Sequence, residues 1–297
     1  MLPILALLSA SLIWGATAPI MKWTFQEVPP FTVAFLRFAV ASLLIIPFVA
    51  KSLKIEKKDF GKILAAALLG TTINIIFFFL GLKLTLAINA ALIIATIPIF
   101  TVLAAAVFLK EKLELKFFFS IGVAAIGLVL ILGPPILTFG PNHLIGGLFL
   151  IIATLSWVGF EVLSKKLFLK YKPVTVTSYS IIIGTVTFLP LFVLDLLFID
   201  PGWPARISLQ GITGIAYGTL FSSIVAYFSW QWGLSKLAAT EAGFFFYLNP
   251  ISAVLVSIIL LGEKVSPLFI AGSTLIAVSL ILAEYKRKTH PLHQSAT

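Results

Sequence analysis

Uncharged, apolar stretches of about 20 residues recur along almost the whole chain, and this feature limits the possible folds most strongly. A helix of about that length crosses the hydrocarbon core of a bilayer and makes its backbone hydrogen bonds internally. We therefore predict an all-α integral membrane protein with ten transmembrane helices, separated by Gly, Pro or charged residues. The expected helices cover residues 3–22, 31–50, 62–82, 86–109, 117–133, 144–163, 174–194, 209–231, 240–261 and 267–284.

The composition supports this prediction and excludes several classes of function. Of the 297 residues, 60% are hydrophobic and only 11% are charged, against roughly 25% charged residues in soluble domains. The chain has no cysteine, which rules out disulfides, thiol catalysis and thiolate metal sites. The net charge of +10 resides in a few short connectors, so it does not indicate nucleic-acid binding.

The positions of the basic residues predict the orientation in the membrane, because cytoplasmic connectors carry an excess of Lys and Arg. If the N-terminus is cytoplasmic, the inner connectors hold most of these residues, including those of segments 51–58 and 165–172. The outer connectors then hold only Lys22, Lys83, Arg206 and Lys264. We expect a multi-pass protein of the cell (inner) membrane with both termini cytoplasmic and a cytoplasmic tail at 286–297.

The second half of the chain repeats the first. At an offset of 143 residues the matching pairs are Trp14 and Trp157, Lys22 and Lys165, Pro30 and Pro173, Thr32 and Thr175, and Pro47 and Pro190. At an offset of 152 residues they are Gly81 and Gly233, Ala90 and Ala242, and Pro98 and Pro250. Five spans per repeat is an odd number, so residues 1–135 and 144–285 are expected to form two inverted repeats. This plan recurs in secondary transporters.

The order and duplication of short motifs resemble the drug/metabolite transporter superfamily, specifically its EamA-type family with two five-helix domains. The motifs are Leu12-Ile13-Trp14-Gly15, Phe35-Leu36-Arg37-Phe38, Gly81-Leu82, Ile97-Pro98, Leu109-Lys110-Glu111-Lys112-Leu113, Asn249-Pro250 and Leu261-Gly262-Glu263-Lys264. The resemblance covers nearly the whole chain. It implies export or exchange of amino acids or related metabolites without ATP, and it leaves the substrate open.

Two prolines are expected to interrupt membrane helices at corresponding positions. Pro98 and Pro250 fall near the centres of the expected helices 86–109 and 240–261. Proline removes a backbone hydrogen bond and clashes with the carbonyl four residues earlier, here that of Ile94 or Phe246. Paired interruptions of this kind indicate a midplane binding site; a packing kink shared by duplication is the alternative.

Several aromatic and neutral polar residues are candidates for contact with a solute. Tryptophans at mid-helix are too deep for the membrane interface, where this residue usually lies, and an amide in mid-membrane is expected to face the protein interior. The expected substrate-binding residues are Trp14, Asn74, Phe78, Trp157, Tyr227, Trp230 and Tyr247. Helix packing and interhelical hydrogen bonding are the alternative roles for these side chains.

Two charged residues inside spans are candidates for coupling or gating. Arg37 lies some two turns inside its helix. The resemblance implies a position outside the central cavity, so a structural or gating charge paired with Glu27 is favoured over substrate binding. Glu161 precedes Lys165 by four residues, a spacing that suits an ion pair; proton coupling or amine binding is the alternative.

The pattern as a whole predicts a secondary transporter that moves a small metabolite outward by alternating access. The neutral, aromatic candidates suit an amino acid or another zwitterionic or amphiphilic solute better than a phosphate. A channel or lipid flippase is the main alternative, and a membrane-embedded lipid enzyme is disfavoured because no catalytic cluster is evident. We expect no cofactor, metal or ATPase partner; the expected partners are the solute, the bilayer and, for coupling, protons.

Overall fold

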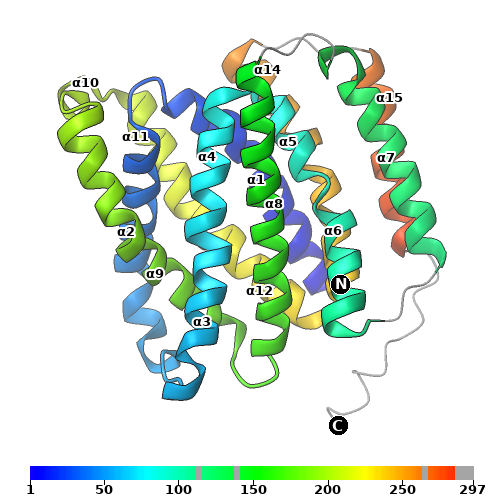
Figure 1. The fold of residues 1–297 in the computed structure, drawn as a ribbon, viewed down its shortest axis with the longest axis horizontal. Helices are drawn as coiled ribbons and strands as arrows, with labels where there is room; N and C mark the ends of the chain where they lie inside the picture. The colour runs from blue at the N-terminus through cyan, green and yellow to red at the C-terminus, as the bar shows by residue number, and fades with distance from the viewer. Residues whose placement is uncertain (112–114, 137–140, 263–266, 285–297) are drawn as a thin grey trace.

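The computed structural model describes residues 1–111, 115–136, 141–262 and 267–284, and within these ranges every regular element is a helix (Figure 1). The expected tail at 286–297 lies outside the described residues. In the first half the membrane helices are α1 (Leu2–Thr24), α2 (Pro30–Val49), α3 (Phe60–Ala67), η3 (Leu68–Ile73), α4 (Asn74–Leu84), α5 (Ala87–Ile94), α6 (Ile97–Ala104), η4 (Ala105–Leu109) and α7 (Leu115–Ile136). In the second half they are α8 (Pro141–Leu167), α9 (Pro173–Leu194), η5 (Asp195–Ile199), α11 (Leu209–Tyr217), η6 (Gly218–Val225), α12 (Ala226–Lys236), α13 (Ala239–Gly243), η7 (Phe244–Leu248), α14 (Asn249–Leu261) and α15 (Pro267–Glu284), and the short helix α10 (Trp203–Arg206) lies in the connector before α11.

Seven helical segments of the described chain are long and apolar enough to cross a membrane. They are Leu2–Thr24, Pro30–Ser52, Lys57–Leu84, Ile145–Leu167, Pro173–Ile199, Leu209–Lys236 and Ala239–Leu261. Shorter apolar helices cover Ile97–Leu109, Phe117–Gly127 and Ile270–Ser279. The chain is thus a helical, multi-pass membrane protein.

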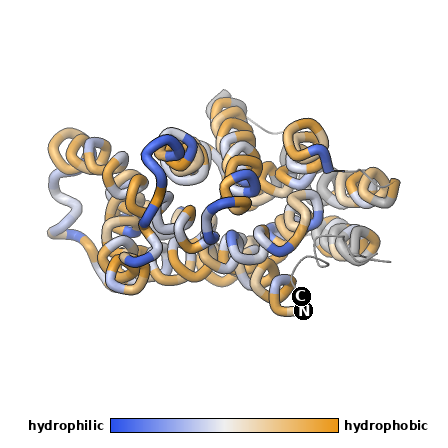
Figure 2. The backbone as a smooth tube through the Cα atoms, turned by 90° about the horizontal axis from the view of Figure 1, so that it is seen from below, coloured by the Kyte–Doolittle hydropathy of each residue, from blue (hydrophilic) through white to orange (hydrophobic). Residues whose placement is uncertain are grey.

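The outer surface of the bundle is apolar. Phe48 and Ile259 are 87% and 80% exposed, as expected for side chains that face lipid rather than water. Figure 2 shows hydrophobic residues along the helices, while hydrophilic residues concentrate in the connectors between them.

Proline positions several helix starts. Pro3, Pro30, Pro98, Pro173 and Pro250 each occupy the first turn of a helix, where the missing backbone N–H removes no intrahelical bond. The apolar stretches predict the helices well, since α1, α2 and α9 begin or end within two residues of the expected bounds. The short helix α10 was not predicted.

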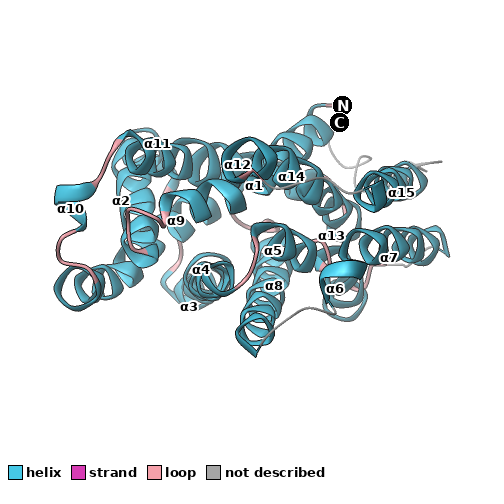
Figure 3. Ribbon diagram, turned by 90° about the horizontal axis from the view of Figure 1, so that it is seen from above, coloured by secondary structure: helices cyan, strands magenta, loops and turns pink. Residues whose placement is uncertain are grey.

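The bundle is built from pairs of helices that are distant in sequence. α2 packs along α9, α4 along α8, and α1 along both α12 and α14. α7 and α15 pack on each other at one edge of the bundle, as Figures 1 and 3 show. The pocket described below is lined in part by residues of α1, α2, α4, α8 and α12.

Candidate functional site

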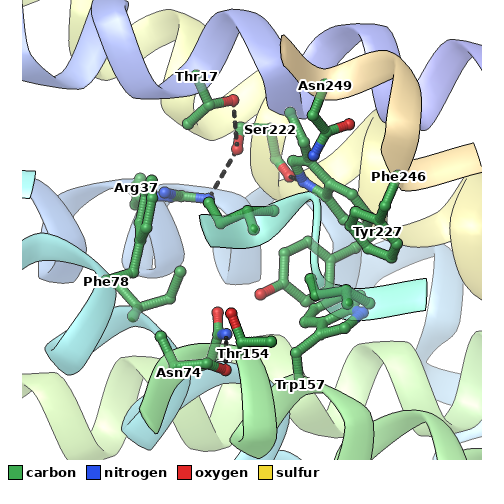
Figure 4. A pocket seen from close by; sticks show the side chains of 15 residues that line it. Thr17, Arg37, Asn74, Phe78, Thr154, Trp157, Ser222, Tyr227, Phe246 and Asn249 are labelled. Carbon is green, nitrogen blue, oxygen red and sulfur yellow. Dashed lines mark hydrogen bonds between the residues drawn. The ribbon is translucent and has the colours of Figure 1, made fainter. Parts of the chain in front are cut away.

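A narrow pocket with a cavity volume of about 70 Å³ lies among helices of both halves of the chain (Figure 4). The first half supplies Trp14, Thr17, Arg37, Asn74, Ile75, Phe78, Ile94 and Ile97. The second half supplies Ala153, Thr154, Trp157, Ser222, Tyr227, Phe246 and Asn249.

Two helix interruptions form part of the wall. The chain leaves the α-helix between α5 and α6, just before Pro98, and winds as the 3-10 segment η7 just before Pro250. Ile94 and Phe246, each four residues before its proline, line the pocket, and so do Ile97 and Asn249. The prolines themselves are not in the wall, so they act through the backbone that they interrupt.

Aromatic rings crowd one end of the pocket. The rings of Trp14 and Trp157 meet edge to face with centroids 4.9 Å apart. The ring of Phe246 stacks on Trp14 at 5.9 Å and touches Trp230 at 4.3 Å. Edge and stacked ring pairs hold one another in place, so this end of the pocket is a rigid apolar surface.

Backbone carbonyls in two π-helical segments orient two of these aromatic side chains. The Trp14 Nε1–H donates to the carbonyl of Ser222 in η6 at 3.1 Å. The Tyr227 hydroxyl donates to the carbonyl of Gly70 in η3 at 2.9 Å. The wider π turn leaves carbonyls open to such donors, and π segments often occur at functional sites.

Glu161 lies fully buried behind the aromatic surface, outside the pocket wall. Its carboxylate accepts hydrogen bonds from the Thr101 hydroxyl at 2.8 Å and from the Trp157 and Trp230 indoles at 3.1 Å each. The expected ion pair with Lys165 is wrong: Lys165 donates instead to the backbone carbonyls of Leu234 and Leu237. The four-residue spacing permits the ion pair, but packing of α12 against α8 offers both groups other partners.

Arg37 is 1% exposed and lines the pocket, in contrast to the expectation that its helix lies outside the cavity. Its Nε donates to the Ser223 hydroxyl at 2.8 Å and its Nη2 to the Ser222 hydroxyl at 3.0 Å. Thr17 also donates to Ser222, at 3.2 Å, so the three side chains form a chain of hydrogen bonds (Figure 4).

The expected pairing of Arg37 with Glu27 is wrong. Glu27 accepts from the Ser208 hydroxyl at 2.6 Å and from the backbone N–H groups of Ser208 and Gly211. The hydrogen bond from the Ser208 side chain, helped by those backbone donors, lowers the pKa of Glu27. The residue therefore serves the connector between α10 and α11, away from Arg37.

Five of the seven expected substrate-binding residues line the pocket: Trp14, Asn74, Phe78, Trp157 and Tyr227. The Asn74 amide donates to the carbonyl of Ala153 at 2.8 Å, which ties α4 to α8. Trp230 lies behind the wall, where it bonds Glu161. Tyr247 is buried away from the pocket, and its hydroxyl has no hydrogen-bond partner in the described part of the chain.

Sequence reasoning missed Thr17, Thr154, Ser222, Phe246 and Asn249 as pocket residues. Thr17 lies one turn beyond Trp14, so the helical spacing could have identified it. Asn249 was visible only as part of the Asn249-Pro250 motif. No signal marked Ser222, whose place depends on how η6 packs on α2.

Contacts between the two halves are reciprocal. A Cβ added to Gly81 would lie 2.6 Å from Leu150 Cγ, and one added to Gly233 would lie 2.6 Å from Leu7 Cγ. The two glycines stand 152 residues apart and the two leucines 143 apart. Ser42 and Thr185, also 143 residues apart, share a hydrogen bond of 2.9 Å between α2 and α9.

The model of the EamA-like transporter family matches residues 1–133 and 144–285. The chain belongs to the EamA-like transporter family. This assignment fits the drug/metabolite transporter superfamily and accounts for a membrane bundle with an interior pocket.

Proteins with similar sequences are described as uncharacterized transporters. Two uncharacterized transporters of Archaeoglobus fulgidus are 27% and 29% identical, and the alignments cover 92% and 85% of this chain and 95% and 87% of theirs. The uncharacterized transporter YyaM of Bacillus subtilis is 26% identical over 93% of this chain and 92% of its own. A solved crystal structure shares the fold with a TM-score of 0.77, at 20% identity and over 94% of this chain and 95% of that one.

Proposed function

We propose that this EamA-like transporter is a secondary carrier built from two inverted five-helix repeats, residues 1–135 and 144–285, with ten spans in total. It moves a small metabolite through the pocket by alternating access. In this scheme the two repeats exchange conformations around a shared site, which opens in turn to either side of the membrane.

The observation that carries the proposal is the way residues at the repeat offsets meet around the pocket. Trp14 touches Trp157, and Ile94 and Ile97 face the pocket as Phe246 and Asn249 do, from the two interrupted segments. The reciprocal glycine–leucine contacts described above follow the same offsets. An approximate two-fold axis through the pocket would produce all of these contacts.

The orientation follows from charge: connectors rich in Lys place both termini on the cytoplasmic side of the inner membrane. The proposed depth of the pocket is near the bilayer midplane, where paired helix interruptions place the sites of many secondary transporters. The proposed direction is export, driven by the solute gradient or by exchange for protons; Glu161, which bonds the pocket residue Trp157, is the proposed coupling group.

The pocket wall favours an amino acid or a similar zwitterionic or amphiphilic solute. Most of the wall is aromatic or aliphatic, and it suits an apolar side chain or ring. The neutral polar side chains are those of Thr17, Asn74, Thr154, Ser222 and Asn249, and Arg37 is the single charged residue of this wall.

Counterflow in proteoliposomes tests the proposal. Liposomes preloaded with one amino acid of a panel should take up the labelled form against its gradient, saturably, with and without a pH gradient across the membrane. Trp157→Ala and Asn74→Ala should reduce this uptake, whereas Ser235→Ala, at a half-buried position of α12 outside the pocket wall, should not. Linear uptake without counterflow would indicate a channel and contradict the carrier.

A further inference from the structure

Arg37 is a buried cation without a counter-ion. The ion pairs of the described chain involve Lys58, Lys62, Lys170 and Arg206, and none includes Arg37. Its neighbours are the neutral hydroxyls of Ser222 and Ser223 and the ring of Phe38, whose centroid lies 4.9 Å from its Cζ.

An unpaired cation in a protein interior is costly, because water no longer solvates it and no anion replaces that solvation. The hydroxyls and the ring compensate only in part, since they carry no net charge. A bound anionic ligand can offset this loss of solvation. Buried ionisable groups in membrane spans commonly mark sites where such ligands or ions bind.

One edge of the planar Arg37 guanidinium also makes no hydrogen bond. Its Nη1 has no hydrogen-bond partner within the described residues, although Nε and Nη2 are both bonded. Two neutral oxygens of the same wall, Thr154 Oγ1 and Asn249 Oδ1, are buried and unpartnered as well. Unpartnered buried groups are rare in native structures, and here three of them belong to one pocket.

We infer that the pocket binds a solute carrying a carboxylate, and that Arg37 binds this group through Nη1. The inference rests on the carrier function proposed above and names the chemical class of its substrate. Guanidinium and carboxylate form strong charge-assisted hydrogen bonds. Thr154 and Asn249 offer acceptors for an ammonium or hydroxyl group of the solute, and the rings of Trp14 and Phe246 contact its apolar part.

A phosphate-bearing or purely cationic solute fits the wall less well. A phosphate carries up to two negative charges, and Arg37 is the one charged side chain in the wall. A solute with an ammonium group alone would meet an unpaired positive charge and no carboxylate in the wall. A monocarboxylate matches the single cation.

Binding of matched acid and amide probes to the purified full chain tests the inference. The pairs are phenylalanine and phenylalaninamide, leucine and leucinamide, and 3-phenylpropionate and 3-phenylpropanamide. Fluorescence of Trp14 and Trp157, which line the pocket, and thermal stabilisation both report binding. We expect at least one acid to bind, and its amide to bind at least about tenfold more weakly. Equal binding within every pair, or binding by no acid of the panel, would overturn the inference.

Variants identify the residue responsible. Arg37→Gln should remove the difference between acid and amide, and Arg37→Lys should keep part of it. Lys165→Gln, which removes a cation outside the pocket wall, should leave the difference intact. Retained discrimination in Arg37→Gln would refute the role of Arg37, and the probe pairs decide the class of solute even if this variant does not fold.

The flux assay separates this inference from the carrier function. If an acid binds in an Arg37-dependent way but shows no counterflow, the carboxylate subsite stands and the carrier fails. If solutes show counterflow with acids and amides treated alike, the carrier stands and the subsite fails.

Discussion

Thr17 and Ser222 share a hydrogen bond beside the pocket, whereas their counterparts at the repeat offsets, Phe160 and Gly70, meet as a ring packed against a glycine. A Cβ at Gly70 would lie 2.3 Å from the Phe160 ring, so this ring packs directly against the backbone of Gly70. At equivalent positions, each of these two contacts therefore joins a helix of the first half to a helix of the second half. Only one of the two contacts is polar, and that contact supports Arg37.

The charged residues differ between the halves in the same way. Ser180 stands at the offset position of Arg37, and Ala18 at that of Glu161. At the pocket and directly behind its wall, each half therefore contributes one charged side chain that its counterpart position lacks. The comparison teaches that the proposed duplication keeps the backbone framework, while the chemistry around the pocket has become one-sided.

The largest effect is expected where Glu161 is removed. Glu161→Ala would leave the Thr101 hydroxyl and the Trp157 and Trp230 indoles as buried donors without an acceptor. We expect a loss of about 4 kcal/mol in the free energy of unfolding. Glu161→Gln, which keeps one acceptor oxygen, should lose less than half of that.

Thermal or denaturant unfolding in detergent measures both variants. Ala18→Ser, a small polar change at the counterpart position, serves as the control and should change stability little. Wild-type stability of Glu161→Ala would show that the hydrogen bonds to the carboxylate contribute little to folding.

The two tryptophans of the pocket should respond unequally although they are counterparts. Trp157 is 4% exposed and bonds Glu161, whereas Trp14 is less buried and bonds a backbone carbonyl. We expect a loss of about 3 kcal/mol for Trp157→Ala and about 2 kcal/mol for Trp14→Ala. Equal losses in unfolding measurements would mean that the bond to Glu161 adds nothing.

The reciprocal glycine contacts allow a finer test. The added methyl of Gly81→Ala would lie 2.8 Å from the Gly146 carbonyl oxygen, a backbone atom, while that of Gly233→Ala would lie 3.2 Å from the Pro3 carbonyl oxygen. We expect losses of about 2 and about 1 kcal/mol respectively, because the backbone oxygen lies closer to the added methyl at Gly81 than at Gly233. Melting temperatures of the two variants decide the ranking; the reverse order would contradict the close approach at Gly81.

The smallest effect, and one of opposite sign, is expected at Arg37. Replacing the unpaired cation by Met should leave the solute-free protein unchanged or stabilise it by about 1 kcal/mol, since a buried charge is removed. Ser180→Ala, at the counterpart position, should change stability by less than about 0.5 kcal/mol. A marked loss of stability in Arg37→Met would assign this arginine a structural role.

Much of the helical framework could be predicted from the apolar stretches and the prolines. Pro30 and Pro173 begin helices, and the interruptions before Pro98 and Pro250 occur where the sequence places them. These features are local: they depend on backbone sterics and on the length of apolar sequence.

Apart from Trp157, which precedes Glu161 by one turn of α8, the partners of the charged residues could not be predicted, because they come from other helices. Glu161 bonds Thr101 and Trp230, and Arg37 bonds Ser223; each of these partners lies at least 60 positions away along the chain. In a membrane helix the lipid-facing side is as apolar as the packed side, so periodicity does not show which side chains face a neighbour. Trp230 and Tyr247 were assigned to the pocket for that reason and lie behind its wall or apart from it.

The anchoring of Trp14 and Tyr227 to main-chain oxygens affects how this pocket can diverge. Because the acceptors belong to the backbone, a change of side chain at Ser222 leaves the acceptor of Trp14 in place. The acceptor of Tyr227 requires a glycine at position 70, since a Cβ there would lie 2.3 Å from the Phe160 ring. Deleting one residue from η3 or η6 would instead rotate the rest of that helix by about 100°. The hydrogen bond that positions the aromatic ring would then be lost. Substitutions elsewhere in the pocket wall can therefore change which solute the pocket selects without moving the rings of Trp14 and Tyr227, provided that the winding of these two turns is preserved.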